Sequence, residues 1–165
     1  MKAKMFRALL PLAIMFTMVS CSSDDSEGTS NDAKLVTSYN YNETELRLAT
    51  LINNYRESKG LNTLQIINHI SYKSEEHNIY MIDNNVVNHD FFQERSDNII
   101  EVLDAEKVGE NIAYNYITAE SALSAWLNSP AHKANIEGDY THFGISVTVN
   151  TITGRKYYTN MFMKK

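Results

Sequence analysis

Cysteine, basic residues and long apolar runs are all scarce in this 165-residue chain, and each scarcity excludes a class of protein. The single cysteine, Cys21, cannot form a disulfide within the chain, which excludes a disulfide-stabilised secreted scaffold. No basic run is present and the formal net charge is −5, so nucleic acid is not an expected partner. The length suits one domain with a modest core, and no internal repeat is visible.

The first twenty residues contain the charged, apolar and small-residue zones of an export signal, in the right order. An almost unbroken apolar run, Ala8–Val19, follows three basic side chains and is shorter than the about 20 residues that span a membrane. The segment ends in "MVSC", which resembles the lipobox of bacterial lipoproteins, with Met18 where leucine is commoner. We therefore expect residues 1–20 to be a lipoprotein signal peptide and Cys21 to be diacylated. The alternative is a thiol that is free or paired with another molecule.

The stretch after Cys21, "SSDDSEGTSNDAK", is acidic and has no apolar side chain large enough to pack. Such a composition is typical of a disordered tether, and it resembles the short acidic export tag of surface lipoproteins. We expect residues 21–41 to be this tether and residues 42–165 to be the folded domain. Removing residues 1–20 takes away three basic side chains and moves the formal charge from −5 to −8. The expected location is the cell envelope, with the lipid on Cys21 inserted in a membrane, at the outer membrane or the cell surface.

The folded part shows helical periodicity first and strand-like runs last. Asn42 and Glu45 form a capping-box pattern that predicts the start of a helix, and Gly60 predicts its end. Further helices are expected at about 68–83, at about 119–128 and in "SPAHKANI". Residues 86–108 are less regular, and a short element is expected near "GENIAYNY". The runs "FGISVTV" and "RKYYTNMFM", joined by "NTITG", predict a hairpin, so the whole indicates an α+β fold.

Three motifs stand out in the folded part: "NHDFF" (88–92), "GENIA" (109–113) and "WLNSPAHKANI" (126–136), with "FGISV" after them. Their order and spacing resemble the CAP superfamily, also called the SCP domain, over about residues 44–163. The resemblance implies an α-β-α sandwich with a small antiparallel sheet and a central cleft.

In that superfamily two histidines and acidic residues line the cleft, and some members bind a divalent metal ion there. The resemblance places the first histidine at His89, the glutamate at Glu110 and the second histidine at His132. Many animal and plant members carry a second glutamate three residues after the tryptophan, where this chain has Ser129. The expected cleft therefore has one carboxylate fewer, and its polar residues are His89, Glu110, Ser129 and His132.

Two neutral imidazoles and one carboxylate suit zinc or a similar divalent ion, with His89 and His132 as its expected ligands. Ser129 and Pro130 fit the N-cap and the first position of a helix, which puts His132 on the first turn. The helix macrodipole disfavours the charged imidazole there and keeps His132 neutral, which is the form that binds metal. Taken alone, each residue has a simpler explanation. His132 would be solvated, Glu110 would face the dipole of a short helix, and His89 would cap a loop.

The other histidines and the tryptophan are expected to be structural. His77 has apolar helical neighbours, which predicts a partly buried ring with a hydrogen bond, whereas His69 and His142 have no obvious partners. Trp126 shares a helical stripe with two leucines, so we expect it in the core rather than on a ligand platform.

Three functions fit these features, and we favour a lipid-anchored extracytoplasmic binding module whose cleft captures a lipid, a peptide or a glycan, with or without a divalent metal. The first alternative is a metal-dependent hydrolase of esters or peptides with Glu110 and His132 as catalytic residues. Ser129 precedes a proline and lacks the glycines of a nucleophile elbow, so it is not an expected nucleophile. The second alternative is a structural or adhesive surface protein. Binding is favoured over catalysis because Glu110 would have to serve both as metal ligand and as base.

Overall fold

The computed structural model describes residues 34–165. The expected signal peptide, the expected lipidation site at Cys21 and most of the expected tether lie outside these residues. Between residues 34 and 165, the helices are all too short or too polar to cross a membrane.

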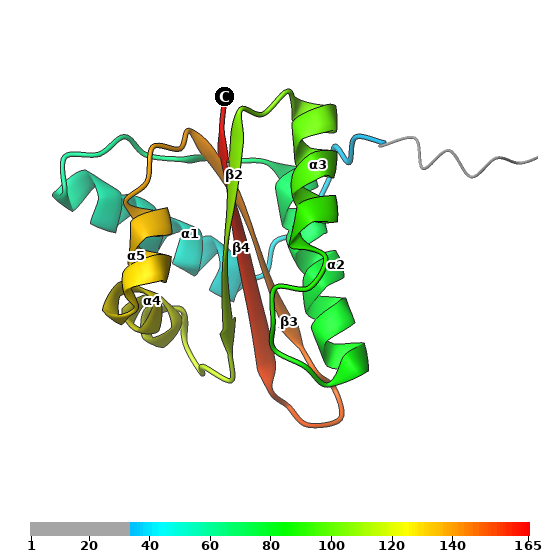
Figure 1. The fold of residues 1–165 in the computed structure, drawn as a ribbon. Helices are drawn as coiled ribbons and strands as arrows, with labels where there is room; N and C mark the ends of the chain where they lie inside the picture. The colour runs from blue at the N-terminus through cyan, green and yellow to red at the C-terminus, as the bar shows by residue number, and fades with distance from the viewer. Residues whose placement is uncertain (1–33) are drawn as a thin grey trace, which may run out of the picture. The chain divides into compact units, whose positions relative to one another are not determined.

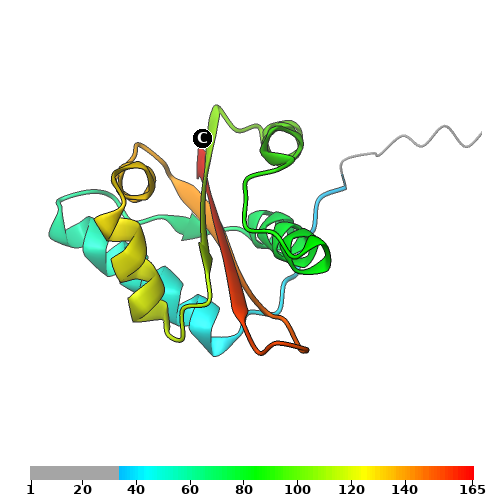
Figure 2. The same cartoon turned by 60° about the horizontal axis from the view of Figure 1, so that its bottom comes forward.

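A four-stranded sheet lies between two groups of helices (Figures 1 and 2). The elements in chain order are α1 (Glu43–Ser58), β1 (Gln65–Ile66), α2 (Asn68–Asn84), α3 (Phe92–Leu103), β2 (Lys107–Tyr114), α4 (Ala119–Asn128), α5 (Pro130–Ile136), β3 (His142–Val149) and β4 (Lys156–Lys164). Helices α2 and α3 cover one face of the sheet, and α1, α4 and α5 cover the other. The α+β class and the expected α-β-α sandwich are confirmed.

The strand order is β1-β3-β4-β2, and β4 pairs antiparallel with both β3 and β2. β1 has two residues and pairs in parallel with β3, so the sheet is mixed. β2, expected only as a short element, is eight residues long and forms one edge of the sheet. The residues of "GENIA" therefore lie on an edge strand, where one side of the backbone faces helices and loops rather than another strand.

Side-chain capping marks the starts of two helices. Asn42 and Glu45 form the expected capping box at the start of α1, and Thr118 caps α4 in the same way. Helix α3, in the stretch expected to be irregular, has no such signal. It begins after Phe91 and ends at Asp104, both with left-handed backbones (φ 57°) and neither with a side-chain cap. Residues other than glycine rarely adopt this conformation, so the sequence gives no sign of these two boundaries.

Apolar side chains fill both faces of the sheet. The larger cluster lies against α1, α4 and α5 and includes Leu48, Trp126 and Phe162, all at most 1% exposed. The cluster on the other face packs Ile70 of α2 and Ile99 of α3 against the sheet. The core position expected for Trp126 is confirmed, and its indole nitrogen donates to the Ile112 carbonyl at 2.8 Å.

The part of β3 beyond its short pairing with β1 is covered by side chains. Glu45 Oε1 accepts from the Val147 amide at 2.7 Å, and Ser71 Oγ accepts from the Ile145 amide at 3.0 Å. An uncovered edge strand invites pairing with another chain, and these bonds satisfy its donors instead.

Residues 34–41 are held against the domain, so the expected tether of residues 21–41 is wrong for this part. The Val36 amide donates to His69 Nδ1 at 3.1 Å, and the Tyr41 hydroxyl donates to Asn68 at 3.0 Å. The Tyr39 hydroxyl lies 3.1 Å from Ser146 of β3. The composition changes at this point to "KLVTSYNY", whose tyrosines supply surface and hydroxyls that the acidic stretch lacks. His69, for which no partner was apparent, is the anchor of this segment.

Candidate functional site

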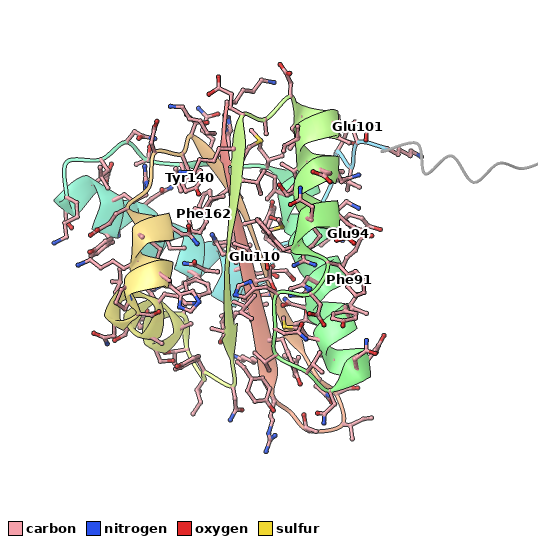
Figure 3. The ribbon with its side chains drawn as sticks, in the orientation of Figure 1. Phe91, Glu94, Glu101, Glu110, Tyr140 and Phe162 are labelled. Carbon is pink, nitrogen blue, oxygen red and sulfur yellow. The ribbon has the colours of Figure 1, made fainter. Side chains whose placement is uncertain are left out.

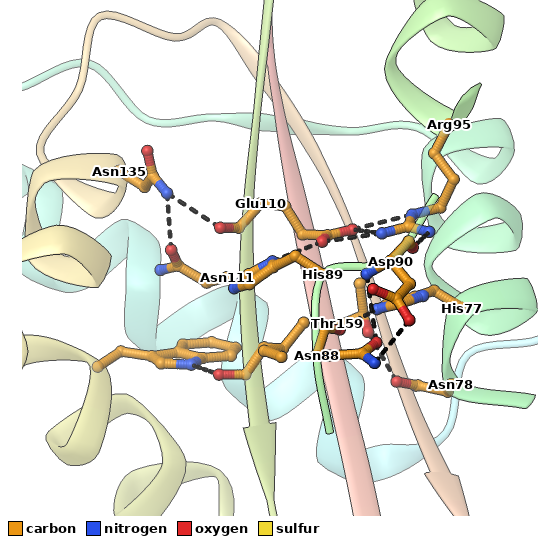
Figure 4. Close-up of polar contacts among 12 residues, drawn as sticks. His77, Asn78, Asn88, His89, Asp90, Arg95, Glu110, Asn111, Asn135 and Thr159 are labelled. Carbon is orange, nitrogen blue, oxygen red and sulfur yellow. Dashed lines mark hydrogen bonds and ion pairs between the residues drawn. The ribbon is translucent and has the colours of Figure 1, made fainter. Parts of the chain in front are cut away.

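The centre of the candidate site is the carboxylate of Glu110, which extends from β2 toward α3 (Figure 4). The Glu110 side chain is 2% exposed. Arg95 of α3 binds it with two nitrogens: Nη2 donates to Oε2 at 2.7 Å and to Oε1 at 2.9 Å, and Nε donates to Oε2 at 2.9 Å. Planar guanidinium and carboxylate groups match well in this geometry. Glu110 is therefore a buried anion with its counter-charge beside it.

His89, in the loop between α2 and α3, bonds to the same carboxylate. Its Nδ1 lies 2.7 Å from Glu110 Oε1. A carboxylate paired with arginine can only accept, so Nδ1 carries the hydrogen. In the neutral ring, Nε2 is then a free acceptor, and half of the side chain is exposed. His89 thus presents an oriented imidazole above a buried ion pair.

The loop that carries His89 is held on both sides of this residue. The Asn88 carbonyl accepts from Nε2 of His77 at 2.8 Å, and the Asp90 carbonyl accepts from Arg95 Nη1 at 2.7 Å. His77 is buried, and burial lowers its pKa, so the neutral ring is favoured. The structural role expected for His77 is confirmed, and it serves the site by fixing the loop.

His132 lies on the first turn of α5, as expected, with Ser129 at the N-cap and Pro130 at the first helical position. Ser129 holds the expected N-cap position, but its side chain makes no capping hydrogen bond. Burial lowers the pKa of His132, and the nearby His89 lowers it further. The expected neutral form is thus favoured, with burial as its leading cause.

Two asparagines join α5 to β2 (Figure 4). Asn111 Nδ2 donates to the His132 carbonyl at 3.0 Å, while Asn135 Nδ2 donates to the Glu110 carbonyl at 3.0 Å. Asn135 Nδ2 also donates to Asn111 Oδ1 at 2.9 Å. The pair therefore links the backbones of Glu110 and His132. Asn111 lies in the motif "GENIA" and Asn135 in the motif "WLNSPAHKANI". Each is a polar residue directly before an isoleucine, and this polarity is the sequence signal that could have indicated their role.

The cleft runs along β2 as two neighbouring hollows. A hollow of about 400 Å³, here called the upper hollow, is lined by His89, Phe92, Lys107, Val108, Gly109, Glu110, Asn135 and Tyr140. A second hollow of about 360 Å³, the lower hollow, is lined by Ile112, Ala113, Tyr114, Tyr116, Ala125, Trp126, Ser129 and His132. The four expected site residues thus divide into two pairs, with His89 and Glu110 in one hollow and Ser129 and His132 in the other.

The chain also matches a family of known proteins. Residues 49–162 match the model of CAP, the cysteine-rich secretory protein family. The chain belongs to this family. The CAP match contains all four expected site residues, and it also contains Arg95 and the two asparagines, which the motifs alone did not assign to the site.

Individual CAP relatives come from several bacteria. The chain is 47% identical over 64 residues to an uncharacterized membrane protein, YlbC, of Bacillus subtilis, a match that covers 38% of this chain and 17% of that protein. Among solved structures, an outer surface protein from Borrelia burgdorferi has a TM-score of 0.66 at 21% identity, over 79% of this chain and 99% of that one. An extracellular SCP-domain protein from Bacillus anthracis has a TM-score of 0.63 at 25% identity, over 78% and 45%. The chain thus spans less than a fifth of YlbC.

The donors of this CAP cleft do not form a three-ligand metal centre that includes Glu110. Both oxygens of its carboxylate already accept hydrogen bonds from Arg95, whose positive charge opposes a second cation at the same place. Residues 34–165 contain no group of three or more histidine, cysteine, aspartate or glutamate side chains arranged around one point. A metal ion held by His89 and His132 stays a prediction, and Glu110 does not fit as its third ligand.

Proposed function

We propose that this protein is a lipid-anchored extracellular binding module whose CAP domain holds a lipid, peptide or glycan ligand in the cleft along β2. The anchor rests on the lipobox-like segment that ends at Cys21. The extracellular location is supported by the outer surface protein and the extracellular SCP-domain protein that share its fold. The membrane-protein relative agrees with attachment to the envelope.

The observation that carries this proposal is the Arg95–Glu110–His89 cluster. A buried ion pair adds little net stability compared with apolar side chains of the same size, because both charges lose their hydration. Here the pair fixes the one imidazole that faces the upper hollow, through the 2.7 Å bond to Glu110. An oriented polar group in a partly apolar hollow is the usual composition of a ligand site.

A hydrolase is the second candidate, and the same cluster defines how it would work. A carboxylate that holds Nδ1–H of a histidine is the arrangement that orients a general base in many hydrolases. His89, rather than Glu110, would then take a proton from water, because both oxygens of Glu110 are already bonded. The Ser129 hydroxyl belongs to the lower hollow, and no serine, threonine or cysteine lines the upper one beside His89. Binding remains the simpler function of these residues.

The test is a titration of full-length protein in detergent, labelled at histidine for NMR, with three probes: palmitate, a random hexapeptide mixture and an oligomer of N-acetylglucosamine. We expect one probe to move the resonances of His89 or His132. The His89→Ala variant should lose at least tenfold in affinity for it, and the His142→Ala variant, altered outside both hollows, should not. Mass spectrometry of the same samples, and of one with methyl palmitate in place of palmitate, detects cleaved probe. Cleavage that disappears in His89→Ala establishes the hydrolase instead, and no resonance change with any probe contradicts both.

Zinc is tested separately by native mass spectrometry of the same protein. If His89 and His132 hold the ion, each alanine variant loses the bound zinc, whereas His142→Ala retains it. Zinc that survives both of the first two changes places the metal elsewhere and removes it from the proposal.

A further inference from the structure

The upper hollow is lined by a tyrosine, Tyr140, whose hydroxyl has no hydrogen-bond partner among residues 34–165. Tyr140 is 2% exposed, and its ring stacks on Phe162 with centroids 5.4 Å apart (Figure 3). The hydroxyl lies against Gly109 of β2, where a Cβ atom would come within 2.4 Å of the Tyr140 oxygen. The hydroxyl oxygen is not among the fully buried side-chain atoms without a partner, so it is accessible. The residue lines the hollow, and its hydroxyl is available to a ligand there.

A cation lies beside the Tyr140 ring. The ammonium of Lys107 is 4.6 Å from the ring centroid and also lines the upper hollow. Lys107 forms no ion pair with any residue from 34 to 165. Asp139, whose pKa the charge of Lys107 helps to lower, is itself paired with Lys164 at 2.8 Å. The carboxylate that lines the hollow, Glu110, is balanced by Arg95. The unbalanced charge of the hollow is therefore positive, although the chain as a whole is acidic.

The backbone of β2 adds a donor at the same place. In an antiparallel pair, every second residue of a strand bonds to its partner strand. Asn115 donates to the Lys156 carbonyl of β4, so the odd-numbered residues of β2 face β4. The even-numbered residues, Glu110 and Ile112 among them, direct their backbone N–H and C=O groups away from β4. On that side the Glu110 carbonyl accepts from Asn135 and the Ile112 carbonyl accepts from Trp126. These two carbonyls are thus occupied, and the Glu110 N–H on the same side of β2 has no hydrogen-bond partner among residues 34–165. A ligand group that only accepts hydrogen bonds fits it best.

We propose that the upper hollow is a carboxylate-binding subsite, in which Lys107 and the Tyr140 hydroxyl bind the free carboxylate of the ligand, and the absence of a side chain at Gly109 lets the Tyr140 hydroxyl lie against β2. A single ammonium with neutral donors matches a monoanion, and no arginine fork, which often binds phosphate, lines this hollow. The subsite deepens the proposed binding function and rests on it. The carboxylate belongs to a fatty acid or to a peptide C-terminus, and the experiment separates these two sources.

Two matched pairs of probes test the subsite on the full-length protein in detergent: octanoate against octanol, and acetyl-trialanine as free acid against its amide. Binding is followed through the ring resonances of ¹³C-labelled tyrosine. We expect the acid of one pair to shift Tyr140 and to bind about tenfold more tightly than its neutral partner, as the loss of a charge-assisted hydrogen bond predicts. Which pair shows this preference identifies the source of the carboxylate.

Two variants that keep the fold assign the preference to its residues. Tyr140→Phe removes one hydroxyl and Lys107→Met removes one exposed charge; each should cancel most of the tenfold preference while leaving the neutral probe unchanged. Lys133→Met, on α5 outside the hollow, is the control and should keep the preference. Equal binding of acid and neutral probes, with a shift of His89 in histidine-labelled protein, overturns the subsite and leaves the binding module standing. Tighter binding of octyl phosphate than of octanoate, or no response of Tyr140 to any probe, also overturns it.

Discussion

At the scale of single residues, Glu110 depends on one partner more than on any other. Its carboxylate is buried, and three of its hydrogen bonds come from Arg95. Removing one member of a buried ion pair leaves the other charge without hydration or partner. His89 can replace only one of these bonds, because it reaches Oε1 alone.

We expect Arg95→Met to lower the free energy of unfolding by about 3–5 kcal/mol, since it leaves the Glu110 charge buried. Adding Glu110→Gln should restore part of the loss, because the amide carries no charge. Urea unfolding followed by circular dichroism measures both. A loss under about 1 kcal/mol for Arg95→Met, typical of exposed pairs, would show that water reaches the carboxylate.

At the scale of elements, how closely α2 approaches the sheet is set at Gly144 of β3. A Cβ atom there would lie 2.3 Å from the Ser71 amide nitrogen and 2.5 Å from the Ile70 carbonyl carbon. These are backbone atoms of α2, which cannot turn aside as a side chain would. The contact also brings Ser71 to the part of β3 beyond its pairing with β1, where the Ser71 hydroxyl accepts from the Ile145 amide.

Gly144→Ala should therefore displace α2 and destabilise the domain by about 3 kcal/mol, at the upper end of the usual cost of overpacking. Gly154→Asn is the matched control. It changes a glycine with φ +70° that has no atom within 4 Å of the added Cβ, and asparagine tolerates this backbone. Thermal unfolding of both compares them; equal losses would contradict the close packing of α2.

The elements that the sequence predicts are those with local signals. The capping box at Asn42 predicts α1, helical periodicity predicts α2 and α4, and two strand-like runs joined by "NTITG" predict β3 and β4. Helix α3 was missed because it starts and ends on left-handed residues without caps. Arg95, on this helix, was therefore missed with it. The motifs led to His89, Glu110 and His132, but the bond between Arg95 and Glu110 joins positions 15 residues apart on a helix and a strand, which no periodicity encodes.

At the scale of the whole molecule, the buried histidines make stability depend on pH. His69 accepts from Val36 through Nδ1, and His77 donates to Asn88 through Nε2 while its Nδ1 is buried without a partner among the described residues. Both rings are neutral in these arrangements. Protonating His69 breaks the bond that holds residues 34–38, and protonating His77 buries an unpaired N–H beside the loop of His89.

Burial lowers the pKa of both rings below the ordinary value of 6.5. The unfolded chain therefore takes up protons first as the pH falls. The stability that the neutral histidines contribute is fully present above about pH 6.5 and declines below it. Glu45 acts in the opposite direction, because burial raises its pKa.

The decline in stability at low pH is thus best measured as a difference between variants. Urea unfolding at pH 7.5, 6.5 and 5.5 should give a shallower decline for His77→Gln, which retains a donor for the Asn88 carbonyl, and a steeper one for Glu45→Gln. An unchanged slope in His77→Gln would mean that His77 titrates as an exposed histidine, and the loop of His89 would then need another anchor.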